Sequence, residues 1–402
     1  MTHQKIFSTP CSEDKDVLKA IHMLADQVIQ DFKGASCDLA VLFVSAVYLE
    51  VDHQKIWSIL RAKLSVNCLL ACNAYGVVGH KSEYESKPAV SLMAMHLPGV
   101  KVLPFSFFPE DVDTISSGKE LLASLDLYPT DKPHFLCLAE PMTCDSGKFV
   151  ELLNEGYPCS PVIGGMASAN VLGFENWLML NGEVYESGVV GVVLCGDIEF
   201  ETIVSQGCRP VGEPYAITKV DRNILYELGS QPALKVLQEM YDKLPEGDRN
   251  LAKDSLFVGL AMDERKVNFQ RGDFLIRNIV GADQERNALA IGAILKAGQT
   301  VQFQLRDADS SKEDLRLSLG KSVKERNYQI KKKNRGLPEA IFLVNCCGRG
   351  LGLFGKPDHD VKMIQSMRGP LPLAGFFANG EFGPVGPKNY VHGYSLSLTI
   401  IR

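Results

Sequence analysis

Three segments of the chain follow one plan, and this internal similarity constrains the fold more tightly than any local motif does. Each segment has an apolar strand-like run, a helical stretch, a second apolar run, a glycine loop and a returning strand. The segments begin with DLAVLFVSA, HFLCLAEP and EAIFLVNCCGRG, and they close with AVSLMAMHL, VVGVVLCG and VHGYSLSLTII. The plan predicts an α/β fold of mixed β-sheets with packed helices, built from repeated strand, helix, strand, glycine-loop and strand units.

Glycines recur at matching places in these segments. Gly76 and Gly79 of the first segment correspond to Gly380 and Gly383 of the third, and Val77 stands where the third segment has Glu381. The glycines therefore belong to the shared plan, whereas the carboxylate does not. In the second segment, Asn181-Gly182 predicts a tight hairpin.

The chain divides into two similar halves in this interpretation. Residues 1–36 contribute an amphipathic helix with Ser12 as its capping candidate, residues 37–222 form the first domain, and residues 223–402 form the second. The break is expected between about 210 and 230, where the stretch SQGCRPVGEPYAITKV loses apolar periodicity. Further strands are predicted at 255–263, 274–283, 288–295 and 300–308, and helices at 231–244 and 310–330.

Composition excludes several classes of function. The formal net charge of −6 and the pI near 5.8 argue against a nucleic-acid partner. No apolar run reaches the roughly 18 residues of a membrane span, and the N-terminus lacks the pattern of a signal peptide, so we expect a cytoplasmic protein without a membrane partner. Eleven cysteines without a CxxC pair indicate free thiols. A Walker lysine motif, HExxH and GxSxG are missing, so we expect no cofactor, no metal and no enzyme.

The motif NCCGRG supplies two candidate site residues. Arg349 lies between Gly348 and Gly350, where flexible backbone and a guanidinium could converge on a carboxylate or another anion. The alternative is an arginine that orders the loop through backbone carbonyls. Cys346 could be a nucleophile activated by Arg349, with His359 and His392 as the only nearby bases in sequence, or it could be a buried inert thiol.

The motif GFFANGEFGPVG supplies the third candidate. Glu381 follows an apolar run and sits among glycines, at the kind of strand end where α/β proteins commonly bind ligands. The alternative is a carboxylate on a solvated turn. Together with Asn379 and Gly380, it would face Arg349 if both strand ends open into one pocket.

Several separated motifs in the right order resemble one known family. SQGCRPVG, NCCGRG and PLAGFFANGEFGPVG, followed by HGYSLSLTII, look like the signature stretches of the FIST family, named for F-box and intracellular signal transduction proteins. The resemblance covers the chain from about residue 37. The positions that carry it are Gly207, Cys208, Arg209, Pro210, Gly212, Cys346, Gly348, Arg349, Gly375, Phe376, Asn379, Gly380, Glu381, Gly383 and Pro384.

The resemblance implies a sensory, ligand-binding module with an N-terminal and a C-terminal FIST domain. In F-box relatives the same domains would help to present substrates to a ubiquitin ligase, but the first 36 residues here offer only one amphipathic helix. We therefore expect a signal-transduction module that passes its signal through a partner protein.

The expected ligand is small and polar, and an amino acid would suit a site in which Arg349 binds a carboxylate and Glu381 an ammonium group. The predicted ligand-binding residues are Arg349, Asn379, Glu381, Cys346, Gly348, Gly380 and Arg209. The alternatives are a protein-interaction scaffold, as in the F-box relatives, or a hydrolase that depends on Cys346.

Overall fold

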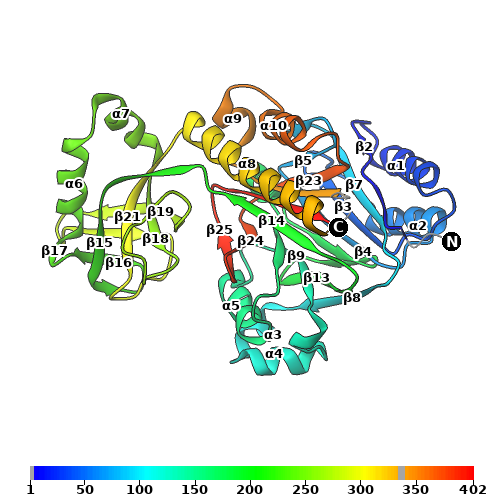
Figure 1. Ribbon diagram of the computed structural model, residues 1–402, viewed down its shortest axis with the longest axis horizontal. Coiled ribbons are helices and arrows are strands. Elements are labelled where there is room, and N and C mark those ends of the chain that lie inside the picture. Colours follow the sequence, from blue (N-terminus) through cyan, green and yellow to red (C-terminus); the bar gives the residue numbers. More distant parts are fainter. Residues whose placement is uncertain (1–3, 334–339) are drawn as a thin grey trace. The chain divides into compact units, whose positions relative to one another are not determined.

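The protein is described by a computed structural model that covers residues 4–333 and 340–402 (Figure 1). The chain forms two compact units. The first unit comprises the chain up to Val204, Ser318–Val391 and Ser395–Arg402, and the second comprises Ser205–Leu317 and His392–Tyr394. The predicted domain boundary near residue 222 stays a prediction about the family's domains.

The first unit contains three mixed sheets, each with a parallel strand pair at its centre. The β3–β4 sheet has the order β1-β7-β3-β4-β11-β12, and β2 also pairs with β7. Its strands are β1 (Ile6–Ser8), β2 (Cys11–Ser12), β3 (Leu39–Ser45), β4 (Leu69–Ala74), β7 (Val90–His96), β11 (Leu178–Leu180) and β12 (Glu183–Tyr185). As predicted from their apolar runs, the central strands β3 and β4 are buried along their whole length.

The other two sheets follow the same arrangement. The β9–β10 sheet has the order β25-β24-β10-β9-β13-β8, and the β22–β23 sheet has the order β14-β26-β22-β23-β5-β6. The strands of the former are β8 (Val100–Phe107), β9 (His134–Ala139), β10 (Val162–Met166), β13 (Val189–Gly196), β24 (Glu381–Val385) and β25 (Lys388–His392). Those of the latter are β5 (Gly76–Val78), β6 (Glu83–Glu85), β14 (Phe200–Ser205), β22 (Ala340–Cys346), β23 (Leu373–Ala378) and β26 (Leu396–Ile401).

Each sheet is completed by a hairpin from a different part of the chain. The hairpin β5–β6 joins the β22–β23 sheet, β11–β12 joins the β3–β4 sheet, and β24–β25 joins the β9–β10 sheet. Val77 of β5 pairs with Phe376, and Glu381 of β24 pairs with Gly165. The mixed α/β class is confirmed, whereas the repetition of one sequence unit stays a prediction, because strand order alone does not test it.

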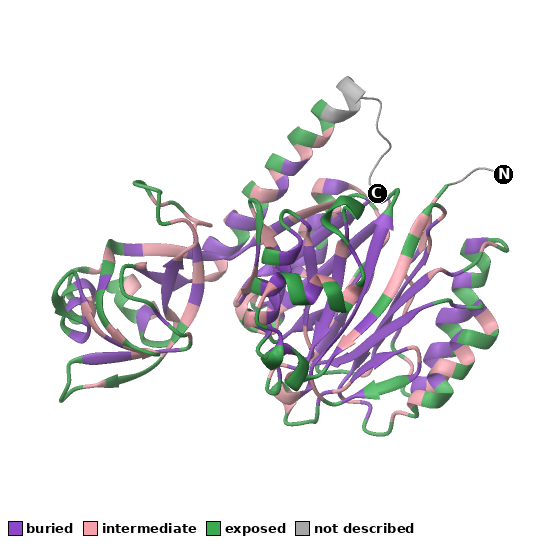
Figure 2. Cartoon of the chain, turned by 90° about the horizontal axis from the view of Figure 1, so that it is seen from below, coloured by how far each residue is buried: buried purple, intermediate pink, exposed green. Residues whose placement is uncertain are grey.

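One apolar core joins the three sheets. It contains aliphatic and aromatic side chains from every sheet, among them Phe43 of β3, Leu136 of β9 and Phe376 of β23. The rings of Phe43 and Phe376 stack with centroids 4.6 Å apart. Figure 2 shows many strands in the purple of buried residues. The core therefore depends on segments from both ends of the chain.

Helices cover the outer faces of these sheets. Helices α1 and α2 contribute to the apolar cluster on the β3–β4 sheet, and α5 contributes to that on the β9–β10 sheet. The helices of the first unit are α1 (Val17–Phe32), α2 (His53–Leu64), α3 (Pro109–Thr114), α4 (Gly118–Leu125), α5 (Ser146–Gly156), α9 (Gly350–Phe354) and α10 (His359–Arg368), with short 3₁₀ turns at Pro129–Asp131 and Ala169–Leu172. Helix α8 (Ala308–Lys333) starts in the second unit and continues in the first.

Two local predictions can be compared with the structure. The hairpin at Asn181-Gly182 is confirmed, since both residues have positive φ between β11 and β12. The capping candidate Ser12 is wrong: it lies in β2, and Asp16 caps α1 by accepting hydrogen bonds from the Leu18 and Lys19 backbone N–H groups. A carboxylate directly before the first helical turn outcompetes a hydroxyl four residues earlier.

The second unit is an antiparallel sheet that closes on itself. Its order is β15-β21-β18-β19-β20-β16-β17, and an additional pairing of β15 with β16 completes a ring. The strands are β15 (Cys208–Asp221), β16 (Ile224–Leu228), β17 (Gln231–Pro232), β18 (Leu256–Ala261), β19 (Phe274–Asp283), β20 (Ala288–Ile291) and β21 (Thr300–Arg306), and the helices are α6 (Ala233–Lys243) and α7 (Glu246–Ser255). The segment expected to contain the domain break thus forms most of the long strand β15.

Candidate functional site

The turn after β22 is shaped by a close approach of backbone to a carboxylate. Gly350 has φ +67°, and a Cβ placed there would lie 2.4 to 2.5 Å from the carboxylate atoms of Glu85. The backbone N–H of Leu351 donates to Glu85 Oε1 at 2.8 Å. Glycine is therefore required at position 350 both by its dihedral and by its neighbour.

Arg349 lies in the interior, where it forms an ion pair. It is 1% exposed, its Nε donates to Asp360 Oδ2 at 2.7 Å, and its Nη2 donates to Asp360 Oδ1 at 2.9 Å. The guanidinium also lies over the ring of Phe354. Burial alone would raise the pKa of Asp360, but the charge and hydrogen bonds of Arg349 lower it below its ordinary value. The bidentate edge of Arg349 is thus occupied by a protein carboxylate.

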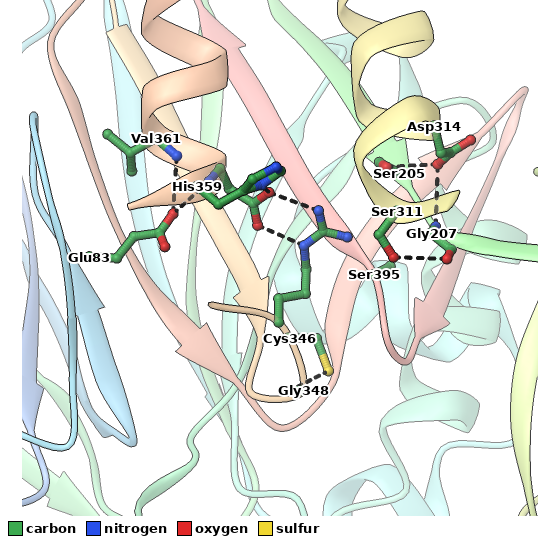
Figure 3. A network of polar contacts seen from close by, with 12 residues as sticks. Glu83, Ser205, Gly207, Ser311, Asp314, Cys346, Gly348, His359, Val361 and Ser395 are labelled. Carbon is green, nitrogen blue, oxygen red and sulfur yellow. Dashed lines mark hydrogen bonds and ion pairs between the residues drawn. The ribbon is translucent and has the colours of Figure 1, made fainter. Parts of the chain in front are cut away.

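A second buried carboxylate adjoins this pair (Figure 3). Glu83, on the hairpin β5–β6, accepts hydrogen bonds at its Oε1 from the backbone N–H groups of Asp360 and Val361, at the first turn of α10. Burial and the nearby charge of Asp360 raise the pKa of Glu83 to about 8. His359 Nδ1 donates to Asp360 Oδ1 at 3.0 Å, and its ring stacks on Phe354. The network holds the signature turn against the hairpin of another segment.

Glu381 is also buried and paired. As the first residue of β24 it is fully inaccessible, and its Oε2 accepts hydrogen bonds from Ser395 N at 3.1 Å and Ser395 Oγ at 2.5 Å. The interpretation of Glu381 as a carboxylate on a solvated turn is wrong, because the returning segment before β26 covers it. Arg349 and Glu381 each contact another protein side chain in this structure.

Ser168 joins the ends of three strands from the three sheets. Its Oγ donates to the carbonyl of Phe377 in β23 at 2.5 Å and accepts from the backbone N–H of Tyr75 after β4 at 2.8 Å. Ser168 itself follows β10 and is fully buried. The hydroxyl is therefore a connector between sheets, and sequence reasoning missed it because its partners are distant in the chain.

The two cysteines of the signature differ in environment. Cys346 ends β22 and is partly exposed, and its Sγ accepts a hydrogen bond from Gly348 N at 3.5 Å. Burial raises the pKa of the Cys347 thiol well above its ordinary value, and the charges of Cys346 and Glu381 act in the same direction. Of the histidines considered as bases, His359 pairs with Asp360, and His392 belongs to the second unit.

The exposed part of the signature forms a rim at the carboxyl ends of β22 and β23. We define the strand-end rim as Cys346, Gly348, Asn379 and Gly380, of which Gly348 and Asn379 are exposed. Cys346 and Ala378 are partners in the parallel register, so both loops leave the same edge of the sheet. Asn379 Nδ2 donates to Asn170 Oδ1 at 3.4 Å. These four predicted site residues are brought together, whereas Arg349 and Glu381 lie beneath them.

Arg209 belongs to the second unit, where it has two carboxylate partners. It donates from Nη2 and Nη1 to Asp248 at 2.5 and 3.1 Å and from Nε to Asp307 at 3.2 Å. The neighbouring signature residue Gly207 donates its N–H to Asp314 and accepts from Ser311 Oγ at its carbonyl (Figure 3). The first signature stretch is thus held by interactions within its own unit.

Sequence reasoning also missed Asp360, Glu83 and Ser395, the partners of the signature charges. Asp360 could have been suspected from PDHDVK, but an acidic residue in the first turn of a helix is common for electrostatic reasons alone. Within the described ranges 4–333 and 340–402, no group of three or more His, Cys, Asp or Glu side chains is arranged to hold a metal ion. None of the helices in that part of the chain has the length and apolar composition needed to cross a membrane.

The fold and the site define a mixed α/β protein in which glycine-rich signature loops at strand ends are anchored by buried charges. Residues 38–231 match the FIST N domain, and residues 233–384 match the FIST C domain. The chain belongs to the FIST family, whose domains are associated with sensing in signal transduction.

Relatives of nearly full length occur in mycobacteria. The chain is 34% identical over 385 residues to "Uncharacterized protein Rv0628c" of Mycobacterium tuberculosis, with 96% of each chain covered. It is 32% identical over the same length and coverage to "Uncharacterized protein Mb0898c" of Mycobacterium bovis. The similarity spans both units of the chain.

Proposed function

We propose that this chain is a sensory protein that binds a small polar ligand at the strand-end rim and passes the signal to a partner protein. One observation carries the proposal: at the carboxyl ends of β22 and β23 the uncharged signature residues are accessible, while the charged ones are buried and paired. An accessible rim with rigid support beneath it is a common form of ligand site at the edge of an α/β sheet.

In this proposal the rim makes the direct contacts. The amide of Asn379 and the thiol of Cys346 supply hydrogen-bonding groups, and Gly348 and Gly380 allow the ligand to approach the backbone. Arg349 and Glu381 act as positioning residues, since Asp360 and Ser395 occupy them. A ligand role for Arg209 stays a prediction, because its guanidinium is paired with Asp248 and Asp307.

Amino acids are the first class of ligand to test. We would titrate the purified chain with a panel of amino acids and other small polar metabolites by thermal shift, and follow positive results by calorimetry, because a ligand that binds only the folded state must raise its stability. Asn379→Ala should weaken binding roughly 10-fold, the value of one hydrogen bond to a charged group.

Asn67→Ala is the matched control. Asn67 is also exposed and also makes one side-chain hydrogen bond, to Asp38 at 3.2 Å, but it lies just before β4 in a different sheet from the rim. If no member of the panel binds, or if both variants bind alike, the strand-end rim is not the ligand site. A stable partner without any ligand would instead favour the scaffold alternative.

A hydrolase that depends on Cys346 is the second candidate. The observation in its favour is the N–H of Gly348 directed at the Cys346 sulfur, which would stabilise a thiolate. Labelling by a thiol-directed activity probe that disappears in Cys346→Ser and persists in Cys347→Ser would support it. An unlabelled wild-type protein would exclude it.

A further inference from the structure

A cluster of three arginines lies at the end of the β22–β23 sheet opposite the signature loops. Arg402 follows β26, whose last residue Ile401 pairs with Ala340, the first residue of β22. Arg368 is the last residue of α10, and Arg326 lies in the part of α8 that belongs to the first unit. These residues and Glu201 of β14 form what we call the arginine cluster.

One carboxylate, that of Glu201, lies beside two arginines of this cluster. Glu201 pairs through Oε2 with Arg402 Nη2 and accepts at Oε1 from Ser322 Oγ, and Ser322 Oγ in turn accepts from Arg368 Nη1 at 2.8 Å. Arg368 Nη2 is 4.0 Å from Glu201, beyond hydrogen-bonding distance. Among the residues that the structure describes, Glu201 is the only carboxylate within ion-pair distance of any of the three guanidinium groups.

The open donors of Arg368 lie on one edge of its guanidinium. Arg368 is 3% exposed, and neither its Nε nor its Nη2 has a hydrogen-bond partner within residues 4–333 and 340–402; the Nε of Arg326 is likewise buried without one in these ranges. Nε–H and Nη2–H point in parallel directions from the planar group, and this edge is the one that pairs bidentately with carboxylates and phosphates. A buried guanidinium whose bidentate edge has no acceptor is costly.

Loss of a proton cannot relieve this cost. Burial lowers the pKa of Arg368, and the positive charges of Arg326 and Arg402 lower it further, whereas the negative charge of Glu201 raises it. An arginine nevertheless keeps its proton at any pH that a protein tolerates, so the positive charge stays. The last carbonyl groups of α10 offset only about half a charge.

We propose that the arginine cluster is a binding site for a small dianionic oxyanion of the phosphate class, either free phosphate or a phosphate monoester. The open edge of Arg368 would bind two oxygens of the anion, and the positive charges of Arg402 and Arg326 would strengthen the binding. This site goes beyond the proposed sensory function and lies at the other end of the sheet from the strand-end rim.

Charge and access favour a dianion. The three guanidinium groups outnumber the one side-chain carboxylate, and a dianion offsets this excess of positive charge better than a monoanion does. The side chains of Glu201 and Arg402 are 25% and 19% exposed, so the cluster reaches the surface beside the buried Arg368. A monovalent carboxylate would leave a charge uncompensated and should bind more weakly.

The test is calorimetric titration of the full chain with inorganic phosphate at neutral pH and low ionic strength. Sulfate and glycerol phosphate form two further arms, and chloride and acetate at matched ionic strength are the negative arms. We expect saturable 1:1 binding of the oxyanion dianions and none of chloride or acetate. Tighter binding of glycerol phosphate than of phosphate would identify a monoester as the natural ligand, and the reverse would identify free phosphate.

Three variants connect the binding to the cluster. Arg368→Lys keeps the charge but removes the bidentate edge, and Arg402→Gln removes a charge at a partly exposed position; each should weaken binding roughly 10-fold or more. Arg316→Gln, at an exposed arginine of the same helix α8 that is paired with Glu313, should leave binding unchanged. Circular dichroism would verify folding, and Arg402→Gln keeps the test decisive if Arg368→Lys does not fold.

Two outcomes would overturn the proposal. The first is a wild-type chain that gives no heat with phosphate, sulfate or glycerol phosphate. The second is phosphate binding that Arg368→Lys and Arg402→Gln leave at wild-type strength.

Discussion

The two ends of helix α10 bury opposite excesses of charge. At its first turn, the carboxylates of Glu83 and Asp360 lie beside the single guanidinium of Arg349. At its last residue, Arg368 lies with Arg402 beside the single carboxylate of Glu201, and the charge of Arg326 also acts on Arg368. Both arrangements agree in sign with the helix dipole, which favours acids at the N-terminus and bases at the C-terminus.

The difference lies in how each excess can be relieved. A surplus carboxylate can take up a proton, and burial together with the charge of Asp360 raises the pKa of Glu83 to about 8, which favours its protonated form at neutral pH. A surplus guanidinium has no such route, which is the reason for proposing that a bound anion balances it. In Arg349, the Nε and Nη2 groups both donate to Asp360. In Arg368, the same two groups have no hydrogen-bond partner within the described part of the chain.

Breaking the ion pair of Arg349 and Asp360 should have the largest effect on stability. Arg349→Met leaves Asp360 buried without its partner, and we expect a loss of about 3 to 5 kcal/mol in the free energy of unfolding measured with urea. The double variant Arg349→Met with Asp360→Leu should be more stable than Arg349→Met alone, because it removes the orphaned charge. A single variant as stable as the wild type would mean that the pair contributes nothing.

Protonation of Glu83 should make the stability of the fold depend on pH, and the raised pKa fixes the sign of that dependence. Its pKa is raised from 4.5 to about 8 in the folded protein, so the fold keeps a proton that the unfolded chain releases. Stability should therefore fall as the pH rises through that window, by at most about 1.4 kcal/mol per pH unit, and the fall should end near pH 8. Asp360, with its lowered pKa, is ionised in both states there and adds no slope.

Glu83→Gln should flatten this profile, since the amide oxygen can still accept from the backbone N–H groups of α10. Urea unfolding at several pH values between about 5 and 9 measures it. A residual slope of the same sign is expected from Glu85, whose pKa burial also raises. Equal slopes for the variant and the wild type would show that Glu83 is ionised in the fold at neutral pH.

The turn that carries Arg349 can be tested without touching a charge. Gly350→Ala should lose about 1 to 2 kcal/mol or more, because alanine is strained at φ +67° and its Cβ meets the Glu85 carboxylate. Gly352→Ala, in the same helix α9 with open space where its Cβ would lie, should be neutral or gain up to about 1 kcal/mol. If the two variants behave alike, the close approach to Glu85 is not a constraint.

A substitution in the arginine cluster should change the free energy of unfolding least when no oxyanion is present. Arg368→Met, measured in chloride, should stay within about 1 kcal/mol of the wild type or exceed it, because the change removes an uncompensated charge while losing one hydrogen bond to Ser322. Adding phosphate should then stabilise the wild type and not the variant. A loss as large as that of Arg349→Met would show that Arg368 is already balanced.

The elements of the fold were predictable, but their assembly was not. Apolar runs such as 38–47 marked the buried strands, and Asn181-Gly182 marked a hairpin, because these signals depend on neighbours in sequence. The exchange of hairpins between sheets depends on pairs such as Val77 and Phe376, which no local pattern encodes. The closed sheet of the second unit was missed for the same reason.

The candidate site was predictable in part. Glycine spacing and polar residues after strands indicated Cys346, Gly348, Asn379 and Gly380, which share one sheet edge. The burial of Arg349 and Glu381 could not be inferred, because it depends on Asp360 and Ser395 arriving from other elements. A charged residue beside a glycine has the same sequence pattern whether it faces solvent or a partner.

The hairpin exchange also fixes the order of events when the chain is made. The hairpin β5–β6 is synthesised early, yet its partner strand β23 is among the last segments to be made. Strand β10 likewise cannot pair with β24 until the end of the chain has been synthesised. Such distant pairing slows folding and leaves strand edges open in the nascent chain. A fragment that ends with the FIST N match at residue 231 would lack both partners. In this chain, strands from both family matches therefore complete one another's sheets.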